Sequence, residues 1–244
     1  MTVPQGLWLT ALVAITATSN ASLNTQDIEQ LHGLNITHLN CRQADDRTLT
    51  SSLGIPIAHH HSQRQELVLL TRHGLVSDIN RCTVSAAGEQ RKLVRVITGK
   101  DSGLFGDWAV ALLNKPLPHT VPRLQPRPVS HDTIAAYASQ GGTIHLPRAS
   151  AQLDRDCPLF LPSVALYDAS DKDQIVLTTC PMLAGKSGAP AIARIDEQPA
   201  LIGVALGYRF ATTSDLQGAP ANASVIRLVD ANILQAMHEL LGEH

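Results

Sequence analysis

The sequence has few aromatic residues and no run of basic ones. Phe, Trp and Tyr make up 3% of its 244 residues, so a hydrophobic core must be built mainly from Val, Ile, Leu and Ala. Hydrophobic residues amount to 44% and charged residues to 16%, which is typical of a globular protein and not of a disordered one. With a net charge of -2 and no Lys/Arg run, the composition argues against nucleic acid as the main partner.

The N-terminal apolar stretch is too short to cross a membrane. It covers Gly6 to Ala17 and is followed by Ser19-Asn20-Ala21, which is similar to a small-residue cleavage site. This pattern predicts a signal peptide over residues 1–21 and a mature chain from Ser22. No Lys or Arg precedes Arg42, so an ordinary N-terminal strand or helix is the alternative. We therefore expect a secreted or periplasmic protein without stable membrane insertion.

The cysteines lack the C-x-x-C spacing of a zinc or thioredoxin-like motif. There are four, which allow three pairings, and two of them lie in each half of the chain. The simplest arrangement is one disulfide per half in an oxidising compartment, with reduced and buried cysteines as the alternative. This interpretation pairs Cys41 with Cys82 and Cys157 with Cys180.

No metal or cofactor is expected. The run His59-His60-His61 is interpreted as a polar loop, because no acidic residue or cysteine stands at ligand spacing from it.

Short strands are the main structural signal along the chain. β-branched or Leu-rich runs bounded by turn residues predict strands, and apolar residues at helical spacing from Val229 predict a C-terminal helix. A connector over 115–130, rich in proline, divides the chain into lobes 22–120 and 121–244. Strands without alternating helices favour barrels or sandwiches. The predicted strands are 66–73, 92–99, 107–114, 141–146, 164–170, 174–180, 190–195 and 200–207.

The stretch GKSGAP, residues 185–190, places one serine between glycines. It is either a tight turn or a nucleophile loop, in which glycines let backbone N–H groups point at a developing oxyanion. A serine nucleophile requires a base, and the base requires a carboxylate partner. His73 ends an apolar run and Asp107 opens another, so both are placed to serve Ser187 from the first lobe. For Asp107 a cap at the start of the strand is the alternative. A site between lobes is where ligand sites often occur.

Four motifs in this order resemble those of the trypsin-like (chymotrypsin-fold) serine proteases, in particular secreted bacterial members. They are LLTRHG for the histidine strand, DWAVALL for the aspartate strand, GKSGAP for the serine loop and ALIGVALG for the strand that follows. The resemblance covers roughly residues 45–240. It implies an all-β fold of two antiparallel six-stranded β-barrels with a C-terminal helix.

The resemblance also assigns roles to individual residues. It implies His73, Asp107 and Ser187 as the catalytic triad, with an oxyanion hole formed by the N–H groups of Gly185 and Ser187. Substrate-binding residues would be Pro181 near the pocket base and Ala205, Leu206 and Gly207 in one pocket wall.

The sequence departs from the family pattern at Gly74, at Lys186 and at Pro181, which falls roughly where trypsin has its acidic pocket residue. Gly74 follows the histidine where animal members have a cysteine. Lys186 stands where trypsin has the aspartate that pairs with a newly cut N-terminus, so activation by that ion pair is not expected.

We therefore expect a serine endopeptidase that acts on protein or peptide substrates through an acyl-enzyme. A protease-like peptide-binding protein without activity, or an esterase using the same triad, are the alternatives. The sequence does not indicate an oligomeric state.

Overall fold

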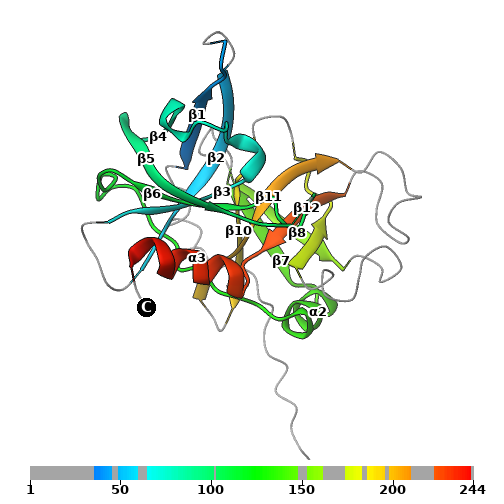
Figure 1. The fold of residues 1–244 in the computed structure, drawn as a ribbon. Coiled ribbons are helices and arrows are strands. Elements are labelled where there is room, and N and C mark those ends of the chain that lie inside the picture. The colour runs from blue at the N-terminus through cyan, green and yellow to red at the C-terminus, as the bar shows by residue number, and fades with distance from the viewer. Residues whose placement is uncertain are drawn as a thin grey trace, which may run out of the picture.

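The computed structural model describes residues 36–45, 49–59, 65–101, 103–147, 153–161, 174–182, 186–195, 198–209 and 223–242. Within them the chain forms two closed antiparallel β-barrels side by side, with a C-terminal helix beneath the first (Figure 1). The predicted fold class is therefore confirmed. The expected signal peptide and the predicted strand 164–170 lie outside the described residues.

The first barrel contains six strands in the order β1-β2-β3-β6-β5-β4, closed by pairing of β1 with β4. Its core cluster is aliphatic and consists of Leu, Val and Ala side chains around the paired Cys41 and Cys82. The strands are β1 Thr37–Arg42, β2 Leu49–Ile57, β3 Leu67–Leu70, β4 Cys82–Ala86, β5 Glu89–Thr98 and β6 Ala109–Leu113.

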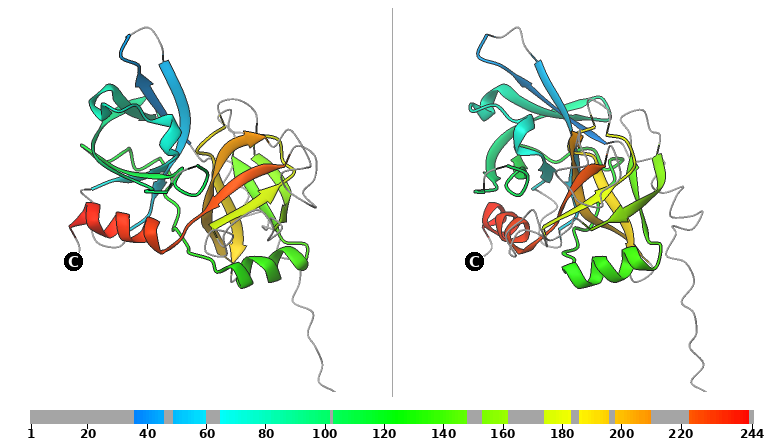
Figure 2. Two further views of the ribbon diagram at one scale, coloured as in Figure 1. Left: turned by 45° about the vertical axis from the view of Figure 1, so that its right-hand side comes forward. Right: turned by 90° about the vertical axis from the view of Figure 1, so that its right-hand side faces the viewer.

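The second barrel repeats this plan in the order β10-β11-β12-β9-β8-β7, closed by pairing of β10 with β7. The left view of Figure 2 shows the two barrels next to each other, with α3 below the first and α2 below the second. The strands are β7 Thr143–Pro147, β8 Leu153–Phe160, β9 Ile175–Thr178, β10 Pro190–Ile195, β11 Gln198–Arg209 and β12 Ser224–Leu228.

The proline-rich connector runs across both barrels. The amide of Leu124 donates to the carbonyl of Pro56 in β2, and the amide of Leu201 in β11 donates to the carbonyl of Gln125. The connector thus ties the first barrel to the second within a few residues.

A helix that the sequence analysis did not predict follows the connector. It is α2, His131–Ser139, and it begins where the hydroxyl of Ser130 accepts from the amide of Thr133 at 3.2 Å. Ile134 and Tyr137 bury one face of α2 in the second barrel's core. That packing, and not a strong local pattern, decides the conformation of this short segment after the proline-rich connector.

The C-terminal helix α3, Ala231–Leu241, packs against the first barrel although it follows the last strand of the second. Its buried residues, Ile233, Ala236, Met237 and Leu240, share a core cluster with Trp108 of the first barrel. The same cluster contains side chains from both barrels, so one continuous hydrophobic interface holds the two together.

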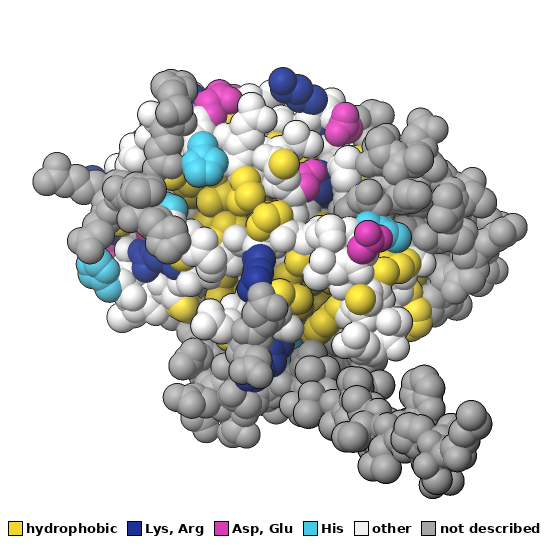
Figure 3. Space-filling view, turned by 90° about the horizontal axis from the view of Figure 1, so that it is seen from below, with side chains coloured by type: hydrophobic (Ala, Val, Ile, Leu, Met, Phe, Trp, Pro, Cys, Tyr) yellow, Lys and Arg dark blue, Asp and Glu magenta, His cyan; other side chains and the backbone are white. Residues whose placement is uncertain are grey.

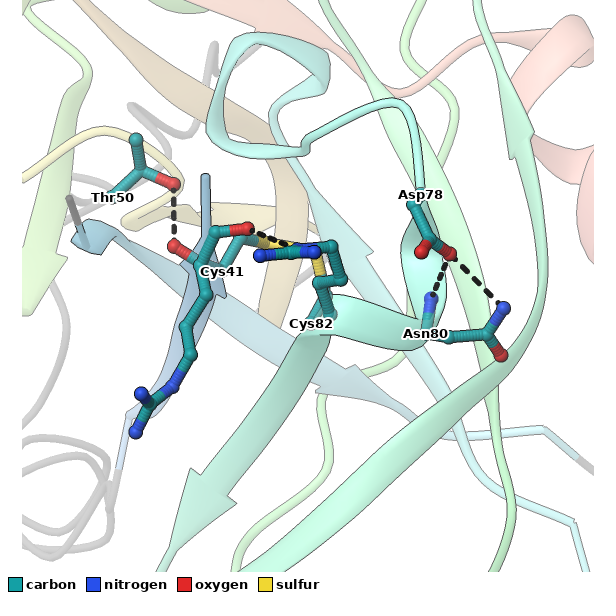
Figure 4. Close-up of a disulfide and its surroundings, with 7 residues drawn as sticks. Cys41, Thr50, Asp78, Asn80 and Cys82 are labelled. Carbon is teal, nitrogen blue, oxygen red and sulfur yellow. Dashed lines mark hydrogen bonds between the residues drawn. A yellow bond between two sulfur atoms is a disulfide. The ribbon is translucent and has the colours of Figure 1, made fainter. Parts of the chain in front are cut away.

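Each barrel contains one disulfide, and the pairs are those proposed from the sequence. Cys41 and Cys82 face each other in adjacent strands β1 and β4, 4.1 Å apart between Cα atoms (Figure 4). Near them the hydroxyl of Thr50 donates to the carbonyl of Cys41. Cys157 and Cys180 form the second bond, across 23 residues. Two disulfides indicate an oxidising environment for the folded chain.

The surface seen from below mixes acidic, basic and hydrophobic side chains, and the described residues of this face gather no Lys and Arg cluster (Figure 3). No helix in the described part of the chain is both long enough and apolar enough to cross a membrane.

Candidate active site

The serine of the GKSGAP loop lies in a turn that requires glycine. Ser187 and Gly188 form the turn directly before β10, and Gly188 has φ +85°. A Cβ atom on Gly188 would lie 1.9 Å from the carbonyl oxygen of Leu53 in β2. Both the backbone conformation and the neighbouring strand therefore exclude a side chain here. Gly185, the other predicted oxyanion-hole residue, lies outside the described residues.

This turn is hydrogen-bonded to both barrels. The amide of Leu53, in the first barrel, donates to the carbonyl of Ser187 at 2.6 Å. The amide of Gly188 donates to the carbonyl of Ala205, in the second barrel, at 2.7 Å. Ser187 is thus held where the two barrels meet, with its side chain partly buried.

His73 and Asp107 are in direct contact. The predicted strand 66–73 ends at Leu70, and His73 lies in the short 3-10 helix η1, Arg72–Gly74. Nδ1 of His73 is 2.7 Å from Oδ2 of Asp107, and the backbone amide of His73 donates to Oδ1 at 2.9 Å. The aspartate side chain is 4% exposed and that of the histidine 38%. One buried carboxylate therefore holds both the ring and the backbone of a histidine that solvent reaches.

Strand β2 links the histidine segment to the serine loop. Gly74, next to His73, packs so closely on β2 that a Cβ atom there would lie 2.3 Å from Oγ of Ser52. The following residue, Leu53, donates to the carbonyl of Ser187. Two consecutive residues of β2 thus contact the histidine and serine segments. Gly74 is the position noted as a departure from animal proteases, and the close packing explains why it has no side chain.

The predicted pocket wall lies directly against the serine. The hydroxyl of Ser187 donates to the carbonyl of Leu206 at 3.3 Å. Gly207 has φ +77°, and a Cβ atom on it would lie 2.3 Å from Oγ of Ser187. The pairing of β11 with β12 shifts between Ala205 and Arg209, so the intervening backbone leaves the regular ladder beside the serine.

Lys186 and Pro181 also lie together. Lys186 is 7% exposed, and its ammonium donates to the carbonyl of Pro181 at 2.8 Å. The lysine therefore joins the two ends of segment 181–186 through a hydrogen bond within the chain.

The guanidinium of Arg72 was not singled out from the sequence. Its Nη1 donates to the carbonyls of Gly99 and Asp101 at 2.9 and 3.0 Å. Arg72 thereby ties the residue before His73 to the loop that leads to Asp107. Because Arg72 directly precedes His73 in the sequence, its position alone could have marked it as a residue that supports the histidine. Of the histidine run, only His59 is described, and its Nε2 lies 3.0 Å from the carbonyl of Gln65.

Two closed six-stranded antiparallel barrels, with a His–Asp pair in one and a serine loop of the other hydrogen-bonded to strand β2 of the first, form a fold compatible with chymotrypsin-like serine proteases. No family model matches the chain, and no curated protein matches it either.

Proposed function

We propose that the protein is a serine endopeptidase that uses Ser187, His73 and Asp107. The observation that carries the proposal is the His73–Asp107 pair, in which one buried carboxylate accepts from both the ring Nδ1 and the backbone amide. A carboxylate in this position selects the tautomer in which Nδ1 bears the proton, which leaves Nε2 as the basic nitrogen.

In the proposed reaction, Nε2 of His73 takes the hydroxyl proton of Ser187 as Oγ attacks the substrate carbonyl. Asp107 stabilises the imidazolium that forms, and His73 then returns the proton to the leaving amine. In the second half of the reaction His73 takes a proton from water, which attacks the acyl carbonyl. His73 then returns the proton to Oγ of Ser187 as the acid product leaves. In the free protein the hydroxyl of Ser187 donates to Leu206, so it must turn toward His73 before attack.

The oxyanion would be stabilised by the amides of Gly185 and Ser187. Each such donor contributes roughly 3 kcal/mol to transition-state stabilisation. The backbone of Leu206 and Gly207 is displaced from regular pairing with β12. We therefore expect this segment of β11 to pair with an extended substrate. Ala205 would line the pocket beside them, and Pro181 would lie near its base.

The substrate would be a protein or peptide, and the protein would act outside the cytoplasm. The two disulfides support an oxidising compartment. The ammonium of Lys186 is already bound to the carbonyl of Pro181, which supports activity without an ion pair to a newly cut N-terminus.

Labelling with a fluorophosphonate probe tests the proposal. The probe should modify wild-type protein at Ser187 alone, as located by peptide mass mapping. Labelling should be lost in Ser187→Ala and in His73→Ala. Modification of another serine, or none in folded and disulfide-bonded protein, would refute the assignment. Peptide and ester substrates then distinguish an endopeptidase from an esterase.

A protease-like peptide-binding protein is the second candidate. The hydrogen bond from Ser187 to Leu206 favours it, because a hydroxyl engaged in that bond is not aimed at a base. This candidate predicts binding of extended peptides without labelling of Ser187, and loss of binding when Gly207 is replaced.

A further inference from the structure

Arg227 is a completely buried cation in β12, a strand otherwise composed of Ser, Val, Ile and Leu. A buried guanidinium is costly unless hydrogen bonds compensate for lost hydration. Nε donates to the carbonyl of Phe105 at 2.7 Å, and Nη1 donates to the carbonyl of Leu228 at 2.6 Å. Nη2 contacts Oδ2 of Asp230 at 2.7 Å. Phe105 lies in a loop of the first barrel, Leu228 ends β12, and Asp230 precedes α3, so one guanidinium joins three parts of the fold.

Phe105 belongs to the loop of the first barrel that leads to Asp107. The amide of Asp107 donates to the carbonyl of Leu104 at 3.3 Å, which closes the turn containing Phe105. Gly106 lies so close to the loop's other limb that a Cβ atom there would be 2.0 Å from the carbonyl oxygen of Asp101. This packing leaves the turn little freedom. A side chain of the second barrel thus holds the backbone two residues before the proposed triad carboxylate.

Asp230 connects the same cation to the C-terminal helix. While Oδ2 contacts Arg227, Oδ1 accepts from the amide of Ile233 and caps α3. The buried face of α3 packs in one cluster with Trp108, the residue after Asp107. The segment carrying Asp107 is therefore held by Arg227 at Phe105 and, at Trp108, by the helix that Arg227 helps to cap.

We propose that Arg227 is a positioning residue that holds the carboxylate of Asp107 against His73. The proposal rests on the proposed function, in which that contact orients the catalytic base. Arg227 itself touches neither His73 nor the reacting atoms in this scheme. It acts through the turn at Phe105, and it makes the geometry of a pair in the first barrel depend on the second barrel.

A matched control lies in the proline-rich connector, where it binds a carboxylate of the first barrel. Arg123 pairs with the buried carboxylate of Glu66 at 2.6 Å and also donates to the carbonyl of Leu117. It is a guanidinium bound to a carboxylate and to backbone, as Arg227 is, but its partners lie outside the loop that leads to Asp107. Replacing Arg123 removes comparable interactions without releasing that loop.

The test compares Arg227→Met, Arg227→Lys and Arg123→Met by two measurements on the full chain. The first is the low-field proton resonance expected for Nδ1 of His73 when it is bound to Asp107, which requires no catalysis. The second is the rate of fluorophosphonate labelling. We expect Arg227→Met to lose the resonance and to react on the order of 100-fold more slowly, because small displacements of catalytic groups have effects of this size. Arg227→Lys should recover part of both, and Arg123→Met should keep both.

An unchanged resonance and labelling rate in folded Arg227→Met would overturn the proposal, as would equal losses in Arg123→Met. If Arg227→Met does not fold, Arg227→Lys and Asp230→Asn must show a weakened resonance, and wild-type behaviour in both would overturn it. Wild-type protein without labelling but with a resonance that Arg227→Met removes would support positioning and refute the peptidase. Wild-type protein that lacks the resonance has no such pair to position, which also overturns the proposal.

Discussion

Replacing Gly188 by alanine should uncouple the serine loop from the first barrel. At φ +85° a Cβ atom costs about 1–2 kcal/mol in backbone strain. The same atom would lie 1.9 Å from the carbonyl oxygen of Leu53, so strand β2 and the loop must move apart. That movement breaks the bond from Leu53 to Ser187 and strains the one from Gly188 to Ala205, each worth about 0.5–1.5 kcal/mol. We expect a total loss of about 2–5 kcal/mol in the free energy of unfolding.

Urea denaturation and fluorophosphonate labelling measure the two consequences of Gly188→Ala. Gly141→Ala is the matched control, because Gly141 has φ +75° but no atom within 4 Å of its Cβ position. The control should lose only the backbone strain, about 1–2 kcal/mol, and should label at the wild-type rate. Gly188→Ala should be the less stable of the two and should label on the order of 100-fold more slowly. Equal stabilities together with equal labelling rates would refute the reasoning.

Three further predictions concern the His–Asp pair, the disulfides and a buried tyrosine. Asp107→Asn should slow labelling on the order of 10⁴-fold at neutral pH, because an amide no longer selects the required tautomer; a rate within tenfold of wild type would contradict this. Replacing Cys157 and Cys180 by serine should lower the free energy of unfolding by about 3 kcal/mol for the 23-residue separation, measured in urea. Burial raises the pKa of Tyr137 above its ordinary value of 10.0, although hydrogen bonds to backbone oppose the rise. Its contribution to stability is therefore complete below pH 10.0 and is lost as the pH rises through the folded-state pKa. Tyr137→Phe should flatten the decline in stability above that pH, and an unchanged slope would show that another group causes it.

Local sequence patterns predicted strands β3 and β6 but missed strand β2 and helix α2. The aliphatic run before His73 and the one after Asp107 became β3 and β6. Each strand is shorter than predicted, because residues 72–74 form the 3-10 helix η1 and pairing of β6 begins only at Ala109. Strand β2 was missed because its start, Leu-Thr-Ser-Ser, is polar. Pairing with β1 stabilises this start, and pairing with β3 stabilises the end of the strand. Helix α2 was missed because a short helix depends on tertiary packing more than on propensity.

Much of the candidate site could be predicted from residue types in order along the chain. A serine between glycines, a histidine at the end of an apolar run and an aspartate at the start of another are local features, each with a chemical reason. The supporting residues could not be found in this way. Leu53 acts through its backbone amide and Arg227 through contacts with residues up to 122 positions away, and neither feature leaves a local pattern.

The sequence by itself therefore predicted an all-β fold with a C-terminal helix, and it indicated the chemistry of the candidate residues. These depend on side-chain type and near-neighbour spacing. Only the tertiary structure decided that β1 pairs with β4 and β10 with β7, that β2 lies between the histidine and the serine loop, and that a buried arginine of the second barrel holds the loop before Asp107. Barrel closure and cross-barrel hydrogen bonds join residues far apart in the chain, and their energy depends on the complete packed structure.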